Sequence, residues 1–218
     1  MGGGAAIAIH GRFRVVTDNT FFAMPETALG SFPDVGASYY LSRLPGFFGE
    51  YVGLTGARLD GAEMLACGLA THFVPLEKLS SLEDALCKAT TGDPKIINNI
   101  ILHDFSNKNP TLKEKSHYFR YVFFFFFLWL PFMTSVFLVT VRIRQENSRD
   151  PTNMLKTINS CFSRRTVEEI ISALEEGDKN MDDWISWTIQ ALKKASPTSL
   201  KISLCSVSTY HALDFIYI

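Results

Sequence analysis

The sequence predicts an α/β fold built as one globular domain. Residues 12–17 and 71–74 contain the β-branched and aromatic residues typical of short strands. Residues 76–88 place leucines at helical spacing among charged residues, which is the pattern of an amphipathic helix. The chain has 218 residues, of which 47% are hydrophobic and 20% charged, so it can bury a sizeable core.

The remaining elements follow, in chain order, from turn residues, caps and apolar periodicity. The expected strand is 20–24, after a turn at 18–19, and the expected helices are 5–9, 35–44, 49–55, 61–68, 95–102, 163–176 and 182–195. Asp60 precedes the helix at 61–68 and is of a residue type that caps helix N-termini. The helix at 5–9 carries no charge, which makes it a candidate for burial.

The charge balance argues against nucleic acid as a partner. The chain has 21 basic and 22 acidic residues and a formal net charge of −1. No broad positive field is therefore available to attract a polyanion. A coenzyme A thioester needs only a local basic patch, so a neutral chain is compatible with that class of ligand.

The four cysteines are far apart in the sequence, and no two of them have C-x-x-C spacing. This spacing predicts neither a disulfide framework nor a zinc site, and it favours free thiols in a reducing compartment. None of the four is placed as a nucleophile, and no metal is required.

Three glycines, Gly2, Gly3 and Gly4, stand before the helix expected at 5–9. Backbone N–H groups at the start of a helix have no intrahelical partner, and the helix dipole adds partial positive charge there. Because glycine has no β-carbon, a ligand oxygen can come close. The cluster therefore predicts an oxyanion site with the N–H groups of Gly3 and Gly2 as donors. The alternative reading is a flexible terminus or a tight turn.

Two acids, Glu26 and Asp34, follow eight residues apart, each after a proline. Glu26 lies in a turn among apolar residues such as Phe22 and Met24, and burial there would raise its pKa and suit it for proton transfer. Asp34 precedes the helix expected at 35–44. It is therefore either the N-cap of that helix or a second functional acid.

His10 and His72 are expected to be structural residues. Neither is accompanied by a Ser/His/Asp order or a G-x-S-x-G elbow in the sequence. A lone histidine beside apolar or turn residues is more often a satisfied core or turn residue than a catalytic one.

Several blocks of the sequence together resemble one protein family. They are MGGG at 1–4, FAMPETALG at 22–30, FPDVG at 32–36, LTGARLDG at 54–61, GLATHFVP at 68–75, CFS at 161–163 and SPTSLKI at 196–202. In these blocks the chain resembles the 3-hydroxyisobutyryl-CoA hydrolase branch of the enoyl-CoA hydratase/isomerase (crotonase) superfamily. The residues of the blocks are most similar to those of the plant members. The joint occurrence of the second and third blocks is far more specific than either block alone.

The resemblance implies a fold, a reaction and a compartment. The fold would be the later turns of a β-β-α spiral followed by C-terminal helices, with the earlier turns and the first oxyanion N–H missing from this chain. The reaction would be hydrolysis of an acyl-CoA thioester, 3-hydroxyisobutyryl-CoA, in valine breakdown. Coenzyme A would be part of the substrate, and no cofactor is expected. The pathway implies the mitochondrion, with the peroxisome as the alternative.

The resemblance also implies roles for the acids and glycines. Glu26 would attack as a nucleophile or activate water, and Asp34 would orient the substrate hydroxyl or assist the leaving thiol. The N–H groups of Gly3 and Gly2 would bind the thioester oxygen. Two other functions stay open. One is enoyl-CoA hydration or isomerisation with differently placed acids. The other is an inactive fragment of the family, which could associate with a membrane through residues 122–141. The FPDVG block favours the hydrolase branch.

Residues 122–141 differ in composition from the rest of the chain, since they include five consecutive phenylalanines and no charge over 20 residues. Their length and apolarity suit a transmembrane helix, and membrane contact is expected only through them. Because the family lacks such a segment and translated pyrimidine-rich non-coding sequence gives phenylalanine runs, we favour an unspliced insertion. The expected division is 1–120 as the C-terminal part of the crotonase-like core, 121–157 as the insertion, 158–204 as the family helical region and 205–218 as a divergent tail.

Overall fold

The computed structural model describes residues 1–107, 110, 151–177 and 183–214 of the chain. Its elements are α1 (Gly3–Ile9), β1 (Val15–Val16), β2 (Phe21–Phe22), η1 (Glu26–Leu29), α2 (Ala37–Leu41), α3 (Phe48–Thr55), β3 (Leu59–Asp60), α4 (Gly61–Ala66), β4 (His72–Phe73), η2 (Leu76–Lys78), α5 (Leu79–Lys88), α6 (Pro94–Ile100), η3 (Ile101–Phe105), α8 (Pro151–Phe162), α9 (Val167–Gly177), α10 (Asp183–Lys194) and α11 (Pro197–Asp214). Short strands interleave with helices in the first part and helices follow, so the predicted α/β class is confirmed.

Two small sheets join elements of the first part of the chain. β1 pairs with β4 in parallel, and β2 pairs with β3 antiparallel. The strands predicted at 12–17 and 20–24 exist, but each is only two residues long. The first begins late because the Arg14 carbonyl accepts hydrogen bonds from both the Thr71 and His72 amides, at 2.9 and 3.1 Å.

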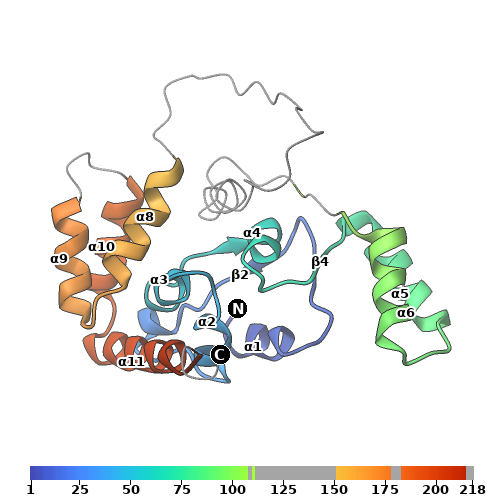
Figure 1. Cartoon of the computed structure of the whole chain (residues 1–218), viewed down its shortest axis with the longest axis horizontal. Coiled ribbons are helices and arrows are strands. Elements are labelled where there is room, and N and C mark those ends of the chain that lie inside the picture. Colours follow the sequence, from blue (N-terminus) through green and yellow to red (C-terminus); the bar gives the residue numbers. More distant parts are fainter. Residues whose placement is uncertain (108–109, 111–150, 178–182, 215–218) are drawn as a thin grey trace, which may run out of the picture.

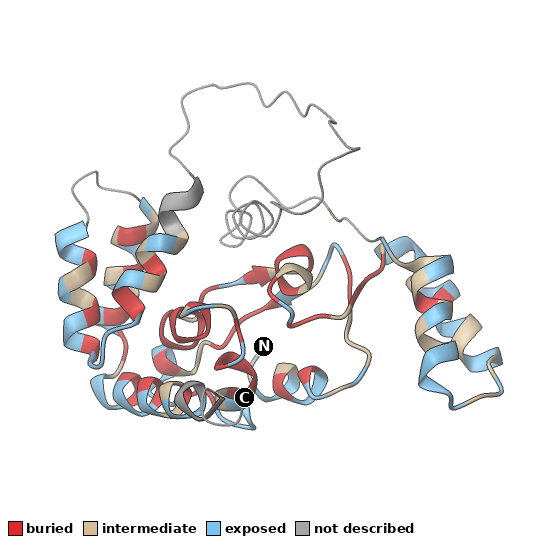
Figure 2. Cartoon of the chain, in the orientation of Figure 1, coloured by how far each residue is buried: buried red, intermediate tan, exposed pale blue. Residues whose placement is uncertain are grey.

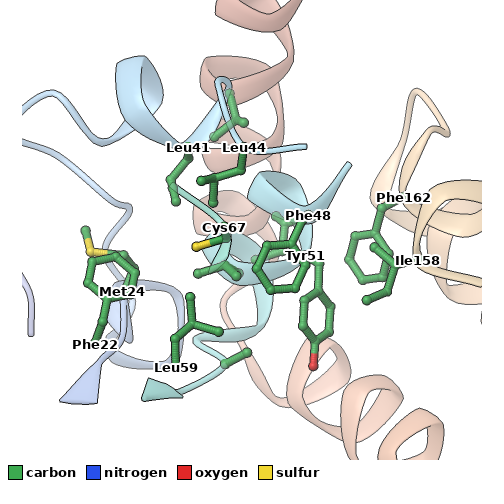
Figure 3. Packing of buried hydrophobic residues seen from close by; sticks show 14 of the residues in the cluster. Phe22, Met24, Leu41, Leu44, Phe48, Tyr51, Leu59, Cys67, Ile158 and Phe162 are labelled. Carbon is green, nitrogen blue, oxygen red and sulfur yellow. The ribbon is translucent and has the colours of Figure 1, made fainter. Parts of the chain in front are cut away.

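The main core surrounds α3, every residue of which is buried (Figure 2). Figure 3 shows Phe48 and Tyr51 of this helix among the packed side chains of the core. The Tyr51 ring meets the Phe162 ring of α8 edge-on, with the ring centroids 5.4 Å apart and the planes at 87°. A β-carbon at Gly49 would collide with the Leu41 backbone. Helix α2 therefore lies directly on α3.

The helices after residue 150 complete this core. Helices α8, α10 and α11 contact α3, and α9 contacts α8, α10 and α11. Figure 1 places α8, α9 and α10 at one end of the molecule. Helix α9 begins later than the predicted residue 163 because the hydroxyl of Thr166 accepts the Glu169 N–H at 3.2 Å and so caps the helix.

The predicted division of the chain meets the described residues in two places. Helix α8 begins inside the segment 121–157 that was predicted as an insertion. Helix α11 runs without a break across the boundary predicted between 204 and 205. Residues 122–141 lie outside the described residues, so the division stays a prediction. In the part of the chain that the structure describes, no helix combines the length and apolarity needed to cross a membrane.

Helices α5 and α6 form a second, smaller core at the other end of the molecule (Figure 1). His72 links β4 to this core, because its Nδ1 lies 2.8 Å from the Thr71 hydroxyl and its Nε2 lies 3.1 Å from Asn98 Oδ1 of α6. Only 4% of His72 is exposed, and this burial lowers its pKa. His72 is therefore a satisfied core histidine, as predicted.

The prediction that Asp34 caps a helix at 35–44 is wrong. Helix α2 begins at Ala37 with Gly36 as its N-cap, and no side chain caps it. The physical reason is that Val35 and Gly36 have φ angles of 50° and 79°. Two successive left-handed residues turn the chain away from the helical path, so the helix starts only after them.

Helix α1 forms where the sequence predicted a helix at 5–9, but it is buried on one side only. Ala6 and Ile9, three residues apart, face the core, whereas Ile7 is 73% exposed. The prediction of a buried helix is therefore only half right. Helical spacing brings one stripe of this apolar run to the core and leaves the other at the surface.

Candidate functional site

Helix α1 begins at a glycine whose backbone no other residue type adopts easily. Gly2, its N-cap, has φ 59° and ψ −145°, a region that is essentially restricted to glycine. The Gly2 carbonyl accepts hydrogen bonds from the Ala5 and Ala6 amides at 3.0 and 3.2 Å. The Gly2 amide in turn donates to the Ala23 carbonyl at 3.4 Å. This last bond ties the start of α1 to the segment that leads into Glu26.

The structure brings Glu26 to the start of α1. Glu26 is the first residue of η1, the short helix after Pro25 that ends at Gly30 in the left-handed conformation. A β-carbon built on Gly2 would lie 3.4 Å from Glu26 Oε1. The predicted neighbourhood of a glycine-lined helix start and an acid is therefore present in the fold, although 23 residues separate the two in sequence.

The Glu26 carboxyl is partly removed from water. Its Oε2 is buried and has no hydrogen-bond partner among the described residues. Burial is the largest influence on its pKa and raises it, a hydrogen bond from its own backbone amide opposes this, and the charge of Asp34 raises it further. A carboxyl with a raised pKa and a spare oxygen can exchange protons with a bound substrate.

Of the two glycines predicted as donors, Gly3 has the more available amide. The Gly2 amide already donates to Ala23, whereas the Gly3 amide makes no hydrogen bond to any described residue. Gly3 is exposed, and a β-carbon there would lie 3.9 Å from Val35 Cγ2. The Gly3 N–H group is therefore open to a ligand oxygen.

Asp34 lies in the turn before α2. Its side chain is exposed, and its backbone carbonyl accepts the Ala37 N–H at 2.9 Å. Its charge is close enough to raise the pKa values of both Glu26 and Tyr40. Asp34 is thus an acid in reach of the Glu26 carboxyl, and its side chain is not used to hold the helix.

Val35 was not predicted as part of the site. Its φ of 50° is left-handed, a conformation in which a β-branched residue is a true outlier that costs about 1 to 3 kcal/mol. Such strain persists only where the surroundings enforce it, and it concentrates at functional sites. No sequence signal could have revealed it, because a valine before a helix is normally read as the first helical residue.

Tyr40 is a second residue that the sequence analysis missed. It is 6% exposed, and its hydroxyl donates to the sulfur of Met24 at 3.3 Å. Burial raises its pKa strongly, and the charges of Glu26 and Asp34 raise it further. Tyr40 therefore stays a neutral phenol beside the two acids. Its helical spacing looked like an ordinary core position, which explains why it was missed.

A hollow of about 600 Å³ borders the same segment. Its lining includes Met1, Pro25 and Ala28, together with Trp184 and Trp187 of α10. Pro25 directly precedes Glu26, and Met1 directly precedes Gly2. Glu26, Gly2 and Gly3 are not among the lining residues themselves, so the hollow borders the segment that carries the acid and does not enclose its carboxyl.

The four cysteines are all free, as predicted. Cys67 is buried, which raises its pKa to about 12 and leaves it a neutral thiol. Burial also raises the pKa of Cys161. Within the described residues, no three side chains of the His, Cys, Asp or Glu type are grouped so that they could hold a metal ion.

The fold is similar to those of solved acyl-CoA enzymes. A carnitinyl-CoA dehydratase from Mycobacterium thermoresistibile aligns with a TM-score of 0.70 and 28% identity, over 97% of this chain and 48% of that one. An enoyl-CoA hydratase from Rhodobacter sphaeroides aligns with a TM-score of 0.63 and 25% identity, over 96% and 47%. This likeness confirms the predicted crotonase-like fold in its partial form.

Several curated relatives are named 3-hydroxyisobutyryl-CoA hydrolase. The 3-hydroxyisobutyryl-CoA hydrolase 1 of Arabidopsis thaliana is 57% identical over 208 residues, which are 95% of this chain and 46% of the relative. The human mitochondrial 3-hydroxyisobutyryl-CoA hydrolase is 38% identical over 94% of this chain and 44% of the relative. The chain thus spans about half the length of the curated relatives it matches.

A family profile covers most of the chain. The profile described as enoyl-CoA hydratase/isomerase matches residues 1–121 and 135–215. The matched residues include both acids, the glycines at the start of α1 and the helices that enclose α3. The protein is therefore a member of the enoyl-CoA hydratase/isomerase family.

Proposed function

We propose that this chain forms part of a thioester hydrolase that acts on 3-hydroxyisobutyryl-CoA. The observation that carries the proposal is the approach of Glu26 Oε1 to Gly2, with a β-carbon there only 3.4 Å away. It sets an acid with a spare buried oxygen beside Gly2, the residue that directly precedes the available amide of Gly3. The shared name of the plant and human relatives supports this choice of substrate.

The amide of Gly3 would bind the thioester oxygen. Negative charge develops on that oxygen when the carbonyl carbon is attacked, and a donor held in place there lowers the barrier by about 3 to 4 kcal/mol. Gly2 supports this amide through its bond to the Ala23 carbonyl. The family resemblance assigns a second donor to a segment outside this chain.

Glu26 would supply the attacking oxygen or activate it. In the first route its carboxylate attacks the carbonyl carbon, the C–S bond breaks, and water then hydrolyses the acyl-glutamyl anhydride. In the second route Glu26 takes a proton from water, and the hydroxide formed attacks the carbonyl carbon. Turnover in heavy-oxygen water tests for the first route, because attack of water on the glutamyl carbonyl of the anhydride leaves the heavy isotope in the Glu26 side chain, and the second route never does.

Asp34 would act on the part of the substrate that faces away from Glu26. It would accept a hydrogen bond from the substrate hydroxyl, or in its protonated form give a proton to the departing thiolate. Its exposed position in the turn before α2 leaves both of its oxygens available to a ligand, because neither bonds a described residue. No cofactor and no metal enters either step.

Release of free thiol from 3-hydroxyisobutyryl-CoA tests the proposal. The full chain should release coenzyme A, and Glu26→Gln should lower the turnover number by about 100- to 10,000-fold. Circular dichroism of both proteins checks that the fold is retained. Equal turnover in the two proteins would contradict the assigned role of Glu26.

A second candidate is the hydration or isomerisation of an enoyl-CoA. The structural likeness to a carnitinyl-CoA dehydratase favours it, because such chemistry uses the same carbonyl site with acids that add or remove protons. The absorbance of the conjugated enoyl thioester distinguishes the candidates. Loss of that absorbance without release of free thiol would favour hydration over hydrolysis.

The proposed compartment is the mitochondrion, with the peroxisome as the alternative. Two relatives, one from Arabidopsis thaliana and one from Homo sapiens, carry the word mitochondrial in their names. Cell fractionation with an antibody against the chain tests this proposal. Recovery of the protein outside the mitochondrial fraction would contradict it.

A further inference from the structure

We propose that His10 is a positioning residue, which holds the turn at residues 34–36 in its left-handed conformation and so keeps Asp34 in place opposite Glu26. The catalytic part of this inference depends on the proposed function. The structural part does not, and it can be tested without turnover.

His10 lies at the C-terminal end of α1 and reaches the turn directly. Its Nε2 lies 3.3 Å from the carbonyl oxygen of Val35. Its ring lies beside two aromatic rings of α2, with centroid distances of 6.3 Å to Tyr39 and 6.0 Å to Tyr40. The Tyr40 contact is edge-on, with the planes at 72°. The imidazole is thus held between the turn and the first turn of α2.

The turn is shaped to receive this ring. A β-carbon at Gly36 would lie 2.7 Å from Nε2 of His10 and 3.0 Å from its Cε1. Real β-carbons essentially never come so close, so the imidazole occupies the space that a side chain at this position would need. Gly36 is therefore required for its φ of 79°, and its missing β-carbon leaves the space in which the imidazole lies.

The strained residue of the turn needs an external partner. Val35 keeps a φ of 50°, which a β-branched side chain does not favour by itself. Among the described residues, His10 is the one side chain that hydrogen-bonds the backbone of Val35. The histidine is therefore placed to offset the strain that sets the direction of Asp34.

One helix then connects both halves of the site. Helix α1 carries the Gly3 amide at its first residue and is followed directly by His10. The hydrogen bonds within α1 and the packing of Ala6 and Ile9 on the core hold its two ends at a helical spacing, which couples the position of the Gly3 amide to that of the turn that bears Asp34. Catalytic groups that act together need such fixed geometry, since small displacements cost large factors in rate.

The catalytic test compares three substitutions at one position. His10→Ala should lower kcat by about 10- to 100-fold with a smaller change in KM. His10→Gln should restore most of the loss, because its amide nitrogen can take the place of Nε2 and donate to the Val35 carbonyl. His10→Asn should not, because its nitrogen corresponds to Nδ1. Equal kcat for the alanine variant and the unaltered chain would overturn the proposal.

A second substitution tests the strain itself. Asparagine tolerates the left-handed conformation far better than valine does. Val35→Asn should therefore raise kcat of the His10→Ala variant, because the turn then needs less support. If the factors by which His10→Ala and Val35→Asn each change kcat simply multiply in the double variant, the two residues act independently and the proposal is overturned.

The structural test uses amide hydrogen exchange and is independent of turnover. The Ala37 N–H donates to the Asp34 carbonyl at 2.9 Å, and this bond closes the turn. His10→Ala should speed exchange in the peptide 34–41, whereas His103→Ala, a change at an exposed histidine of η3, should not. Unchanged exchange at 34–41 would overturn the inference. A chain that releases no thiol yet shows the faster exchange would refute the proposed function alone.

Discussion

Two acidic regions of this molecule differ in how their glutamate side chains are hydrogen-bonded. In the capped helix, residues 60–66, Asp60 Oδ1 accepts the Glu63 amide at 2.9 Å and Glu63 Oε2 accepts the Asp60 amide at 2.7 Å. In the acid segment, residues 25–36, Glu26 keeps a buried oxygen without a described partner, and no side chain caps the helix that follows. The capped helix satisfies its acids, while the acid segment leaves one free.

The difference separates an acid that stabilises the fold from an acid that is available for chemistry. Glu63 is only 3% exposed, yet its hydrogen bonds make it an ordinary structural residue. Glu26 is less buried, but its raised pKa and its unpaired oxygen are costs that the fold alone does not need. Local rules are broken most often at functional sites, and here they are broken in the acid segment.

The largest expected effect comes from removing one charge in each region. Glu26→Gln should abolish most turnover, by about 100- to 10,000-fold, and yet raise stability at neutral pH. Glu63→Gln should keep both turnover and the capping box, because the glutamine oxygen can still accept the Asp60 amide. Thermal melts and thiol release on both variants check the pair. A Glu63→Gln enzyme that loses turnover as strongly as Glu26→Gln would break the comparison.

The pH dependence of the first variant follows from the sign of the Glu26 shift. A pKa raised in the folded state means that the folded form binds the proton more tightly. The stability contributed by Glu26 is then fully present below the ordinary glutamate pKa, about 4.3, and is lost as pH rises through the raised pKa. The gain in stability from Glu26→Gln should therefore be absent at acidic pH and should appear as the pH rises to neutral.

The next effect tests the scaffold on which both regions rest. Gly49→Ala places a β-carbon against the Leu41 backbone, and backbone cannot move aside as a flexible side chain can. We expect a loss of about 3 kcal/mol or more in the free energy of unfolding. Gly92→Ala, where nothing lies within 4 Å of the added carbon, is the matched control. Urea denaturation of both variants measures the difference, and equal midpoints would contradict it.

A smaller effect compares the two aspartates directly. Asp60→Ala removes a helix cap and should lower stability by about 1 kcal/mol while thiol release is retained. Asp34→Ala removes no cap, because α2 begins at Gly36 without one. It should leave stability nearly unchanged and lower turnover. Urea denaturation measures the stability of both variants, and the thiol assay measures their turnover. A loss of stability in Asp34→Ala would contradict the prediction, because it would show that the turn depends on the Asp34 carboxylate.

The smallest effect is a shift of the pH profile. Asp34 raises the pKa of Glu26 through its negative charge, and the reaction needs ionised Glu26. Asp34→Asn should therefore move the acid limb of kcat/KM to lower pH, by less than one unit because salt screens an exposed charge. Asp84→Asn, a change at an exposed acid of α5, should leave the limb in place. A shift to higher pH would contradict the coupling.

Signals carried by neighbouring residues predicted much of this fold. The cap residue Asp60 predicted the start of α4, and the apolar periodicity of 76–88 predicted α5. Strand lengths at 12–17 were overestimated, because the pairing partner and not the local composition limits a strand. The start of α2 was placed too early, since no local signal reports that Val35 is left-handed.

The sequence by itself determined the residues to which the proposed chemistry is assigned, which are Gly2 and Gly3 without side chains, Glu26 in an apolar turn and Asp34 after a proline. Only the tertiary structure decided that Glu26 lies beside Gly2, that its Oε2 is buried, and that His10 reaches the Val35 carbonyl. Propensities and caps act over about four residues, whereas these contacts join segments more than twenty residues apart. The packing of α1, η1 and α2 onto the core sets them.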